Sequence, residues 1–277
     1  MTGDLDGPAL LFCPGDRPDR FAKAAERSDT VILDLEDAVG PAGKTAARAH
    51  VEAALPTLGG RAVVRVNGAA TAWFHDDVAA IRRAGARRVM LPKADNPHVL
   101  RELDGLRVIA LCESAAGVLA APALAAEANC AALFWGGEDL IADLGGHSSR
   151  GPGGRYRPVV EHARSRVLLA AAAAGLPAID AVYLDIADLD GLRTETEEAI
   201  GSGFAAKACV HPGQVAVVRD AFRPTDGQLA CARAVIAGAK EHGDGVFTHQ
   251  GRMVDGPVVA HAARILARHE ATGSALG

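Results

Sequence analysis

Three carboxylates follow an apolar run near the start of the chain. Residues 31–40 read VILDLEDAVG, in which Asp34, Glu36 and Asp37 fall within four positions. A buried strand that ends in so much negative charge needs a cation or a proton-transfer role beside it, because unpaired buried charge is costly. The chemistry that these residues could serve is therefore metal binding or acid–base catalysis.

Polar residues also follow other apolar, β-like runs. They are Arg65 with Asn67, Lys93, Glu113, Glu138 with Asp139, and His211. Any one of them alone would be interpreted as a solvated loop residue or a helix cap. Together they become informative if the fold brings the ends of these runs to one place, so the elements that carry them decide the interpretation.

Short β-like runs alternate with Ala-rich segments of helical period along most of the chain. The β-like runs cover residues 9–13, 30–35, 62–66, 88–92, 107–112, 131–135, 178–182 and 206–210. The helical segments cover residues 17–27, 43–54, 72–84, 114–127, 158–174, 188–201 and 212–222. Strands separated by helices imply right-handed crossovers and a parallel sheet, and runs rich in Val, Ile and Leu imply strands buried on both faces.

Eight such units predict an α/β fold that closes into a (β/α)8 TIM barrel. The length of 277 residues agrees with the roughly 250 that this fold typically takes. The alternative is an open doubly wound sheet, but no GxGxxG motif follows the first β-like run. In a barrel the C-terminal ends of the strands meet at one mouth, where active sites form, so we expect the polar residues to converge there.

The pattern changes after residue 223. A helix over 226–241, a Gly-rich turn, the segment VFTHQGRMVDG and a last helix over 257–269 complete the chain. We therefore expect a barrel core over 1–223 and a C-terminal helical and loop extension over 224–277. The extension is too small to be a domain, so it should pack on the barrel or on a neighbouring subunit.

Composition excludes several classes of function. The net charge of −5 gives no nucleic-acid-binding footprint. Five cysteines without a CxxC pair favour reduced thiols over a disulfide framework. The N-terminus lacks the apolar segment of a signal peptide, and the run VLLAAAAAG is far shorter than the roughly 20 residues that cross a bilayer. The sequence predicts a soluble cytoplasmic protein with no membrane partner.

The residue types indicate which metal the mouth would bind. There is no HExxH motif and no Cys/His cluster at zinc spacing, and the concentrated donors are carboxylates. Hard oxygen ligands suit Mg²⁺ or Mn²⁺, which typically keep one or two protein carboxylates. Glu113 and Asp139 follow adjacent strands and form the natural pair. The carboxylates of DLED would then hold the waters of the metal or pair with Arg and Lys, with direct ligation as the alternative.

The chain also resembles a known family. The matching stretches are LFCPGDRPDRFAKA, VILDLEDAVGPAGKTAAR, VVRVNG, VMLPKAD, IALCESAAG, LFWGGEDLIADLG, KACVHPGQ and GRMVDGPVV. In this order they are similar to the citrate lyase beta-subunit-like proteins of the HpcH/HpaI aldolase superfamily. The resemblance implies a Mg²⁺-dependent barrel, assembled as a homotrimer, that cleaves or forms a carbon–carbon bond in a 3-hydroxyacyl thioester.

The resemblance also implies roles for individual residues. Glu113 and Asp139 would bind the metal, with Glu113 also bordering the substrate, and Arg65 would contact the substrate and stabilise charge in catalysis. Asp255 would be the catalytic acid/base. Because it lies in the tail beyond the eighth βα unit, we expect it to act in the site of a neighbouring subunit, with a turn of the chain or a cap of the last helix as the alternative.

Further residues would hold the rest of the thioester. By the same resemblance, Lys23 and Lys44 would meet the phosphates or pantetheine arm of coenzyme A. Val210 and His211 would line the acyl pocket.

Several functions remain open at this point. The leading one is a lyase for an acyl-CoA thioester of the citramalyl-, malyl-, citryl- or 3-hydroxy-3-methylglutaryl-CoA type, giving acetyl-CoA and a keto acid. Alternatives are a citrate lyase beta subunit that acts on an acyl-carrier thioester within a complex, and a catalytically silent acyl-CoA-binding relative. A pyruvate-type aldolase would leave the basic residues near the first strand without a phosphate to bind.

Overall fold

A closed parallel barrel forms most of the chain. The computed structural model describes residues 5–243 and 245–274. Eight strands pair in sequence order, and the last pairs with the first. They are β1 (Ala9–Pro14), β2 (Thr30–Asp34), β3 (Ala62–Arg65), β4 (Arg88–Leu91), β5 (Arg107–Cys112), β6 (Cys130–Trp135), β7 (Ala178–Asp180) and β8 (Ala206–Cys209). The predicted TIM barrel is therefore confirmed.

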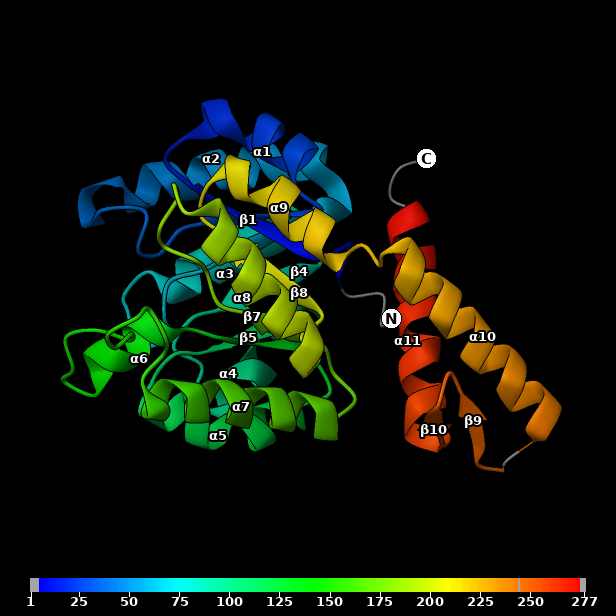
Figure 1. Cartoon of the computed structure of the whole chain (residues 1–277). Coiled ribbons are helices and arrows are strands. Elements are labelled where there is room, and N and C mark those ends of the chain that lie inside the picture. The colour runs from blue at the N-terminus through cyan, green and yellow to red at the C-terminus, as the bar shows by residue number, and fades with distance from the viewer. Residues whose placement is uncertain (1–4, 244, 275–277) are drawn as a thin grey trace. The chain divides into compact units, whose positions relative to one another are not determined.

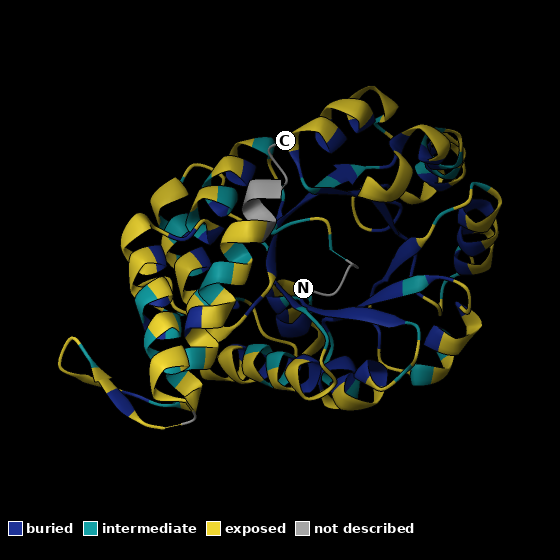
Figure 2. Ribbon diagram, turned by 90° about the vertical axis from the view of Figure 1, so that its right-hand side faces the viewer, coloured by how far each residue is buried: buried dark blue, intermediate teal, exposed yellow. Residues whose placement is uncertain are grey.

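Helices follow the strands and cover the outside of the barrel (Figure 1). They are α1 (Phe21–Arg27), α2 (Lys44–Leu58), α3 (Phe74–Arg83), α4 (Pro97–Glu102), α5 (Ala115–Ala125), α6 (Gly137–Asp143), α7 (Pro158–Ala173), α8 (Leu189–Ser202) and α9 (Pro212–Phe222), with short 3-10 helices at Pro18–Arg20, Pro41–Gly43 and Gly59–Arg61. The sequence pattern did not indicate α4 and α6, because six or seven residues are too few to display a helical period. Figure 2 shows buried strands inside helices whose outer faces are exposed.

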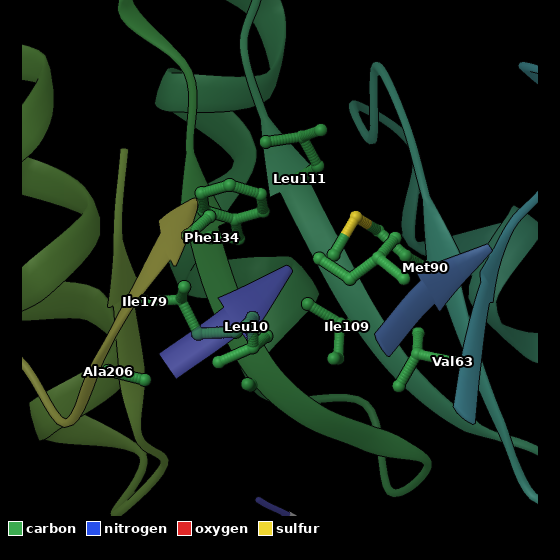
Figure 3. Close-up of a cluster of buried hydrophobic side chains, with 11 residues drawn as sticks. Leu10, Val63, Met90, Ile109, Leu111, Phe134, Ile179 and Ala206 are labelled. Atoms are coloured by element: carbon green, nitrogen blue, oxygen red, sulfur yellow. The ribbon is translucent and has the colours of Figure 1, made fainter. Parts of the chain in front are cut away.

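The interior of the barrel is filled by alternate residues of the strands. The cluster comprises Leu10, Ile32, Val63, Met90, Ile109, Leu111, Ala132, Phe134, Ile179, Ala206 and Ala208. Figure 3 shows these side chains gathered inside the ring of strands. Side chains in a strand repeat their direction every second residue. Asp34, Arg65 and Glu113 follow Ile32, Val63 and Leu111 by two, so they face inward above this apolar layer.

The C-terminal part forms a second compact unit, which begins at Arg219, within α9. It contains α10 (Asp226–His242), a hairpin of β9 (Phe247–His249) and β10 (Arg252–Val254), and α11 (Gly256–Ser274). Thr225 and Gln228 form a reciprocal capping box at the start of α10. Ala232, Val235, Phe247, Val254 and Ala262 give this unit an apolar core of its own.

The helices of this unit match the helical segments expected after residue 223. The division that the sequence pattern places between 223 and 224, and the packing of the extension on a barrel, stay predictions. Among the described residues, no helix combines the length and the apolar character that a membrane crossing requires.

Candidate active site

A cavity of about 470 Å³ opens at the C-terminal ends of the strands. We call it the mouth cavity. Its lining includes four residues that the sequence placed in the site, namely Arg65, Glu113, Asp139 and Val210. It also includes the aromatic and aliphatic residues Phe12, Leu111, Phe134, Trp135, Tyr156, Val182 and Leu184. The mouth therefore combines a few charged groups with an apolar surround, which is typical of a small-molecule site.

Arg65 ends β3 and is held rigidly. Its Nε and Nη2 donate to the two carboxylate oxygens of Asp34, at 2.7 and 2.6 Å. The Phe12 ring lies 4.9 Å from the guanidinium carbon, and Nη1 lies 3.0 Å from Glu36 Oε2. Burial alone would lower the pKa of Arg65, but the hydrogen bonds and charge of Asp34, with the charges of Glu36 and Glu113, raise it. Arg65 is therefore a fixed cation with a preset direction.

Glu113 follows β5 and is 3% exposed. Its Oε1 accepts a hydrogen bond of 3.0 Å from the backbone N–H of Lys93. A Cβ at Gly136 would lie 2.9 Å from the Cβ of Glu113, so only glycine leaves room for this side chain. Burial, then the charges of Asp139 and Glu36, raise the pKa of Glu113 to about 8. The metal-free site thus holds more negative charge than its own cations balance.

Lys93 connects two of these carboxylates. Its φ of 49° lies in the left-handed region, which is uncommon outside glycine and frequent at functional sites. This backbone directs its N–H to Glu113, while its Nζ donates to Glu36 Oε1 at 2.6 Å. Burial raises the pKa of Glu36 even though Arg65 and Lys93 oppose that rise, and Glu36 Oε2 has no hydrogen-bond partner among the described residues.

Asp139 lies in the first turn of α6, directly after β6. Gly136 and Gly137 make the tight connection that brings this turn to the mouth cavity. The neighbouring Glu138 accepts a hydrogen bond from the Ser149 hydroxyl, whereas no hydrogen bond or ion pair joins the Asp139 carboxylate to another described side chain. Asp139 is therefore available to a ligand.

The donor set fits a magnesium ion. In the described part of the chain, no group of three or more His, Cys, Asp or Glu side chains could hold a metal. Mg²⁺ does not need such a group, because it usually binds one or two carboxylates and keeps waters or substrate oxygens in its other positions. Glu113 and Asp139 could supply those carboxylates, since the nearest cations, Arg65 and Lys93, are already paired with Asp34 and Glu36.

The other predicted residues lie elsewhere. Lys23 is exposed on α1, and His211 is exposed at the start of α9, where its Nδ1 accepts from the N–H of Gly213. Lys44 is buried, and its Nζ donates to the carbonyls of Leu35 and Glu36 at 2.7 Å each. Neither lysine nor His211 lines the mouth cavity. Their roles toward coenzyme A and the acyl group stay predictions.

Asp255 belongs to the C-terminal unit. Its Oδ1 accepts a hydrogen bond of 3.3 Å from the N–H of Val258, and its carbonyl accepts from the N–H of Val259. Asp255 therefore caps the start of α11. A cap at this position leaves its catalytic role as a prediction.

The sequence reasoning missed the aromatic side of the mouth cavity. Trp135 ends β6 and donates from Nε1 to Asp180 Oδ1 at 2.8 Å, and the Tyr156 ring stands edge-on to it at 5.3 Å. A signal was present for Trp135, because LFWGGED places it four residues before the predicted metal ligand Asp139. Tyr156 comes from the loop after α6, and nothing in its local sequence indicates where that loop returns.

Comparison with known proteins agrees with this geometry. The model of the family "HpcH/HpaI aldolase/citrate lyase" matches residues 9–212. The citrate lyase subunit beta-like protein of Mycobacterium tuberculosis is 48% identical over 262 residues, which cover 95% of each chain. The (3S)-malyl-CoA thioesterase of Cereibacter sphaeroides is 34% identical over 277 residues, covering 95% of this chain and 94% of the relative.

A solved structure extends the likeness to three dimensions. It is the CitE protein of Mycobacterium tuberculosis in complex with magnesium, acetoacetate and coenzyme A, with a TM-score of 0.91 and 46% identity over 96% of this chain and 99% of that one. A close homologue thus contains magnesium together with a keto acid and coenzyme A. The family that the sequence motifs indicated is confirmed, and the chain belongs to the HpcH/HpaI aldolase/citrate lyase family, among the citrate lyase subunit beta-like proteins.

Proposed function

We propose that the protein is a Mg²⁺-dependent lyase that cleaves or forms the carbon–carbon bond of a 3-hydroxyacyl-CoA thioester. The observation that carries the proposal is the pair Glu113 and Asp139, two carboxylates without a balancing cation, beside the fixed cation Arg65 in one cavity. The complex of the Mycobacterium tuberculosis relative with magnesium, acetoacetate and coenzyme A supports the same class of substrate.

The reaction needs the protein to hold the metal, to stabilise charge on oxygen and to transfer a proton at C2. In cleavage, the hydroxyl on C3 loses its proton, the C2–C3 bond breaks, and its electron pair forms the enolate of acetyl-CoA, which is then protonated at C2. Magnesium held by Glu113 and Asp139 would supply Lewis acidity and a template for the acid half. Arg65 would face the oxygen on which charge changes, and a preorganised donor of this kind typically lowers the barrier by about 3 kcal/mol.

Asp255 is our candidate for the proton transfer at C2, acting on the site of a neighbouring copy in a homotrimer. Complementation tests it. Asp255→Asn and Glu113→Gln subunits, each inactive alone, should regain activity when unfolded and refolded together, because some sites then combine an intact Glu113 with an intact Asp255. Mixed assemblies that stay inactive would place Asp255 in its own chain or outside the reaction.

The substrate is tested by product analysis. Malyl-, citramalyl-, citryl- and 3-hydroxy-3-methylglutaryl-CoA should be screened with Mg²⁺ and with a chelator. We expect at least one to give acetyl-CoA and a keto acid only with the metal. Free coenzyme A without a keto acid would indicate thioester hydrolysis instead, the reaction for which the Cereibacter sphaeroides relative is named. Activity only with an acyl-carrier protein and partner subunits would favour a citrate lyase beta subunit.

A further inference from the structure

A second cavity lies beside the mouth cavity. Its volume is about 350 Å³, and Glu138, Val182 and Leu184 line both cavities. The rest of its lining is polar and comes mainly from the loop after α6 and the segment after β7, namely Ser148, Ser149, Arg150, Gly154, Tyr183 and Asp185. Empty space therefore continues past the mouth cavity on the side of β6 and β7.

Four side chains in contact with one another connect the linings of the two cavities. The Trp135 and Tyr156 rings meet edge-to-face, with centroids 5.3 Å apart and an interplanar angle of 75°. The Arg150 guanidinium carbon lies 3.9 Å from the Tyr156 ring centroid and 5.4 Å from that of Tyr183. Trp135 and Tyr156 line the mouth cavity, whereas Arg150 and Tyr183 line the second. We call these four residues the aromatic–arginine stack.

Each member of the stack is anchored by a carboxylate. Asp180 accepts from Trp135, and Glu195 accepts from the Tyr156 hydroxyl at 3.3 Å and from Arg150 Nη2 at 2.6 Å. The Tyr183 hydroxyl donates to Asp188. These bonds occupy the polar groups of Trp135 and Tyr156. Trp135 is fully buried and supports the Tyr156 ring, and Tyr156 lines the mouth cavity.

The stack is also placed close to the metal ligands. A Cβ at Gly137 would lie 3.1 Å from the Trp135 ring, so this ring packs directly on the turn of α6 that carries Asp139. Tyr156, which this ring supports, lines the same cavity as Glu113 and Asp139, so a substituent on a substrate carbon held there would extend toward Tyr156. Because hydrogen bonds anchor the aromatic–arginine stack, a long substituent cannot displace it without breaking several of them.

We propose that the aromatic–arginine stack, with Tyr156 at its centre, selects the substrate by the size of the substituent on C3. It admits hydrogen or methyl at C3 and disfavours longer alkyl chains. The space that a longer chain would need is the second cavity, which Arg150 and Tyr183 line. This inference rests on the proposed lyase function, since it assumes that a hydroxyacyl or keto acid binds at Glu113 and Asp139.

Binding of keto acids of increasing length tests the proposal. Pyruvate, 2-oxobutanoate, 2-oxopentanoate and 2-oxohexanoate should be titrated calorimetrically into the Mg²⁺-loaded protein. The wild type should bind pyruvate best and 2-oxohexanoate least. Tyr156→Ala joins the two cavities, so the ratio of the affinities for 2-oxohexanoate and pyruvate should rise by about tenfold or more, since a methylene in an apolar site changes discrimination by at least that much.

Matched variants separate the ring from its hydroxyl and its support. Tyr156→Phe keeps the ring and should keep the wild-type profile. Arg150→Lys keeps the charge but loses the flat group that backs Tyr156, so it should shift the profile in the same direction by less. The kcat/KM values for thioesters with longer C3 substituents should follow the binding data.

The contrary outcomes are distinct. A Tyr156→Ala protein with unchanged Mg²⁺ affinity and unfolding temperature but a wild-type length profile overturns the proposal. If Tyr156→Ala does not fold, Arg150→Ala decides, and an unshifted profile in that variant also overturns it. A wild-type protein that binds none of these acids with Mg²⁺ overturns the lyase function and this inference together.

Discussion

Two clusters of buried charged residues lie at the same end of the barrel and differ in how their charge is balanced. The outer cluster lies between β7, β8 and the helices, where Asp180 accepts from Trp135, Arg164 and Lys207, and Lys207 also donates to Glu195. The inner cluster contains Asp34, Glu36, Glu113 and Asp139 with the cations Arg65 and Lys93.

The two clusters shift the pKa values of their buried carboxylates in opposite directions. Burial alone would raise the pKa of Asp180, but Lys207 and Arg164 outweigh it and hold that pKa below its usual value. Glu113 is similarly buried, yet its pKa rises because Asp139 and Glu36 add to the effect of burial. Two carboxylates that are similarly buried therefore have pKa values shifted in opposite directions, according to the charges around them. A balanced cluster holds the fold together, and an unbalanced one is prepared for a cation from outside.

The largest expected effect comes from removing charge from the inner cluster. Glu113→Gln should lower kcat/KM at least about a thousandfold, since the loss of a catalytic metal removes several kcal/mol of charge stabilisation. In chelator, the same variant should unfold at the wild-type temperature or above, because a neutral amide is easier to bury than the carboxylate. Calorimetric Mg²⁺ titration and thermal unfolding measure both. Retained Mg²⁺ affinity would remove Glu113 from the metal site.

The outer cluster should respond in the reverse manner. Lys207→Met leaves Asp180 and Glu195 short of a cation, and breaking a buried pair from one side typically costs about 3–5 kcal/mol. Urea unfolding of the metal-free protein measures this loss. Arg83→Met, which breaks the exposed pair with Glu52, is the control and should change stability little. Equal effects of the two substitutions would contradict the balance that we assign to the outer cluster.

A smaller effect is expected where the charge of the inner cluster is kept but its geometry is lost. Arg65→Lys retains a cation but cannot form the two parallel bonds to Asp34. We expect kcat to fall roughly a hundredfold, the loss typical of one preorganised donor, with Mg²⁺ affinity nearly unchanged. A variant with normal kinetics and a lowered unfolding temperature would instead make Arg65 a packing residue.

The smallest expected effect is a difference in pH dependence between the clusters, measured in chelator. Between its ordinary pKa and about 8, Glu113 is protonated in the folded protein and ionised in the unfolded chain, so its contribution to stability falls as pH rises. Asp180 does the opposite: its contribution is present above its ordinary pKa and is lost as pH falls through the lower, folded value.

Urea unfolding at several pH values measures this difference. The stability of Glu113→Gln relative to wild type should increase steadily between pH 5 and 8. The deficit of Asp180→Asn should shrink in acid. Two variants with parallel pH profiles would show that the clusters do not differ in this respect.

The sequence predicted the parts of the site that lie at strand ends. Asp34, Arg65 and Glu113 each end or follow an apolar run, and a closed barrel brings those ends together. Contacts between residues far apart in the chain were not predictable in this way. Lys207 and Asp180 both lie within apolar runs. Their ion pair depends on the register of β7 and β8, which the sequence does not reveal.

Backbone geometry was equally hidden from the sequence. The stretch VMLPKAD indicates a strand end at Lys93, and the left-handed φ that turns its N–H to Glu113 appears only in the structure. The position of Tyr156 likewise depends on how the loop after α6 folds back on Trp135 and Arg150. Local sequence patterns identify candidate site residues, whereas the fold of the loops determines which of these residues are in contact.

The double contact made by Lys93 has a consequence for the order of events in catalysis. Its N–H holds Glu113, its ammonium group holds Glu36, and Glu36 lies against Arg65. A movement of Glu113 toward an arriving ion would therefore be transmitted through Lys93 and Glu36 to Arg65, our candidate for substrate binding. If Arg65 has that role, metal binding would align it before the substrate arrives, and we expect metal to bind before acid.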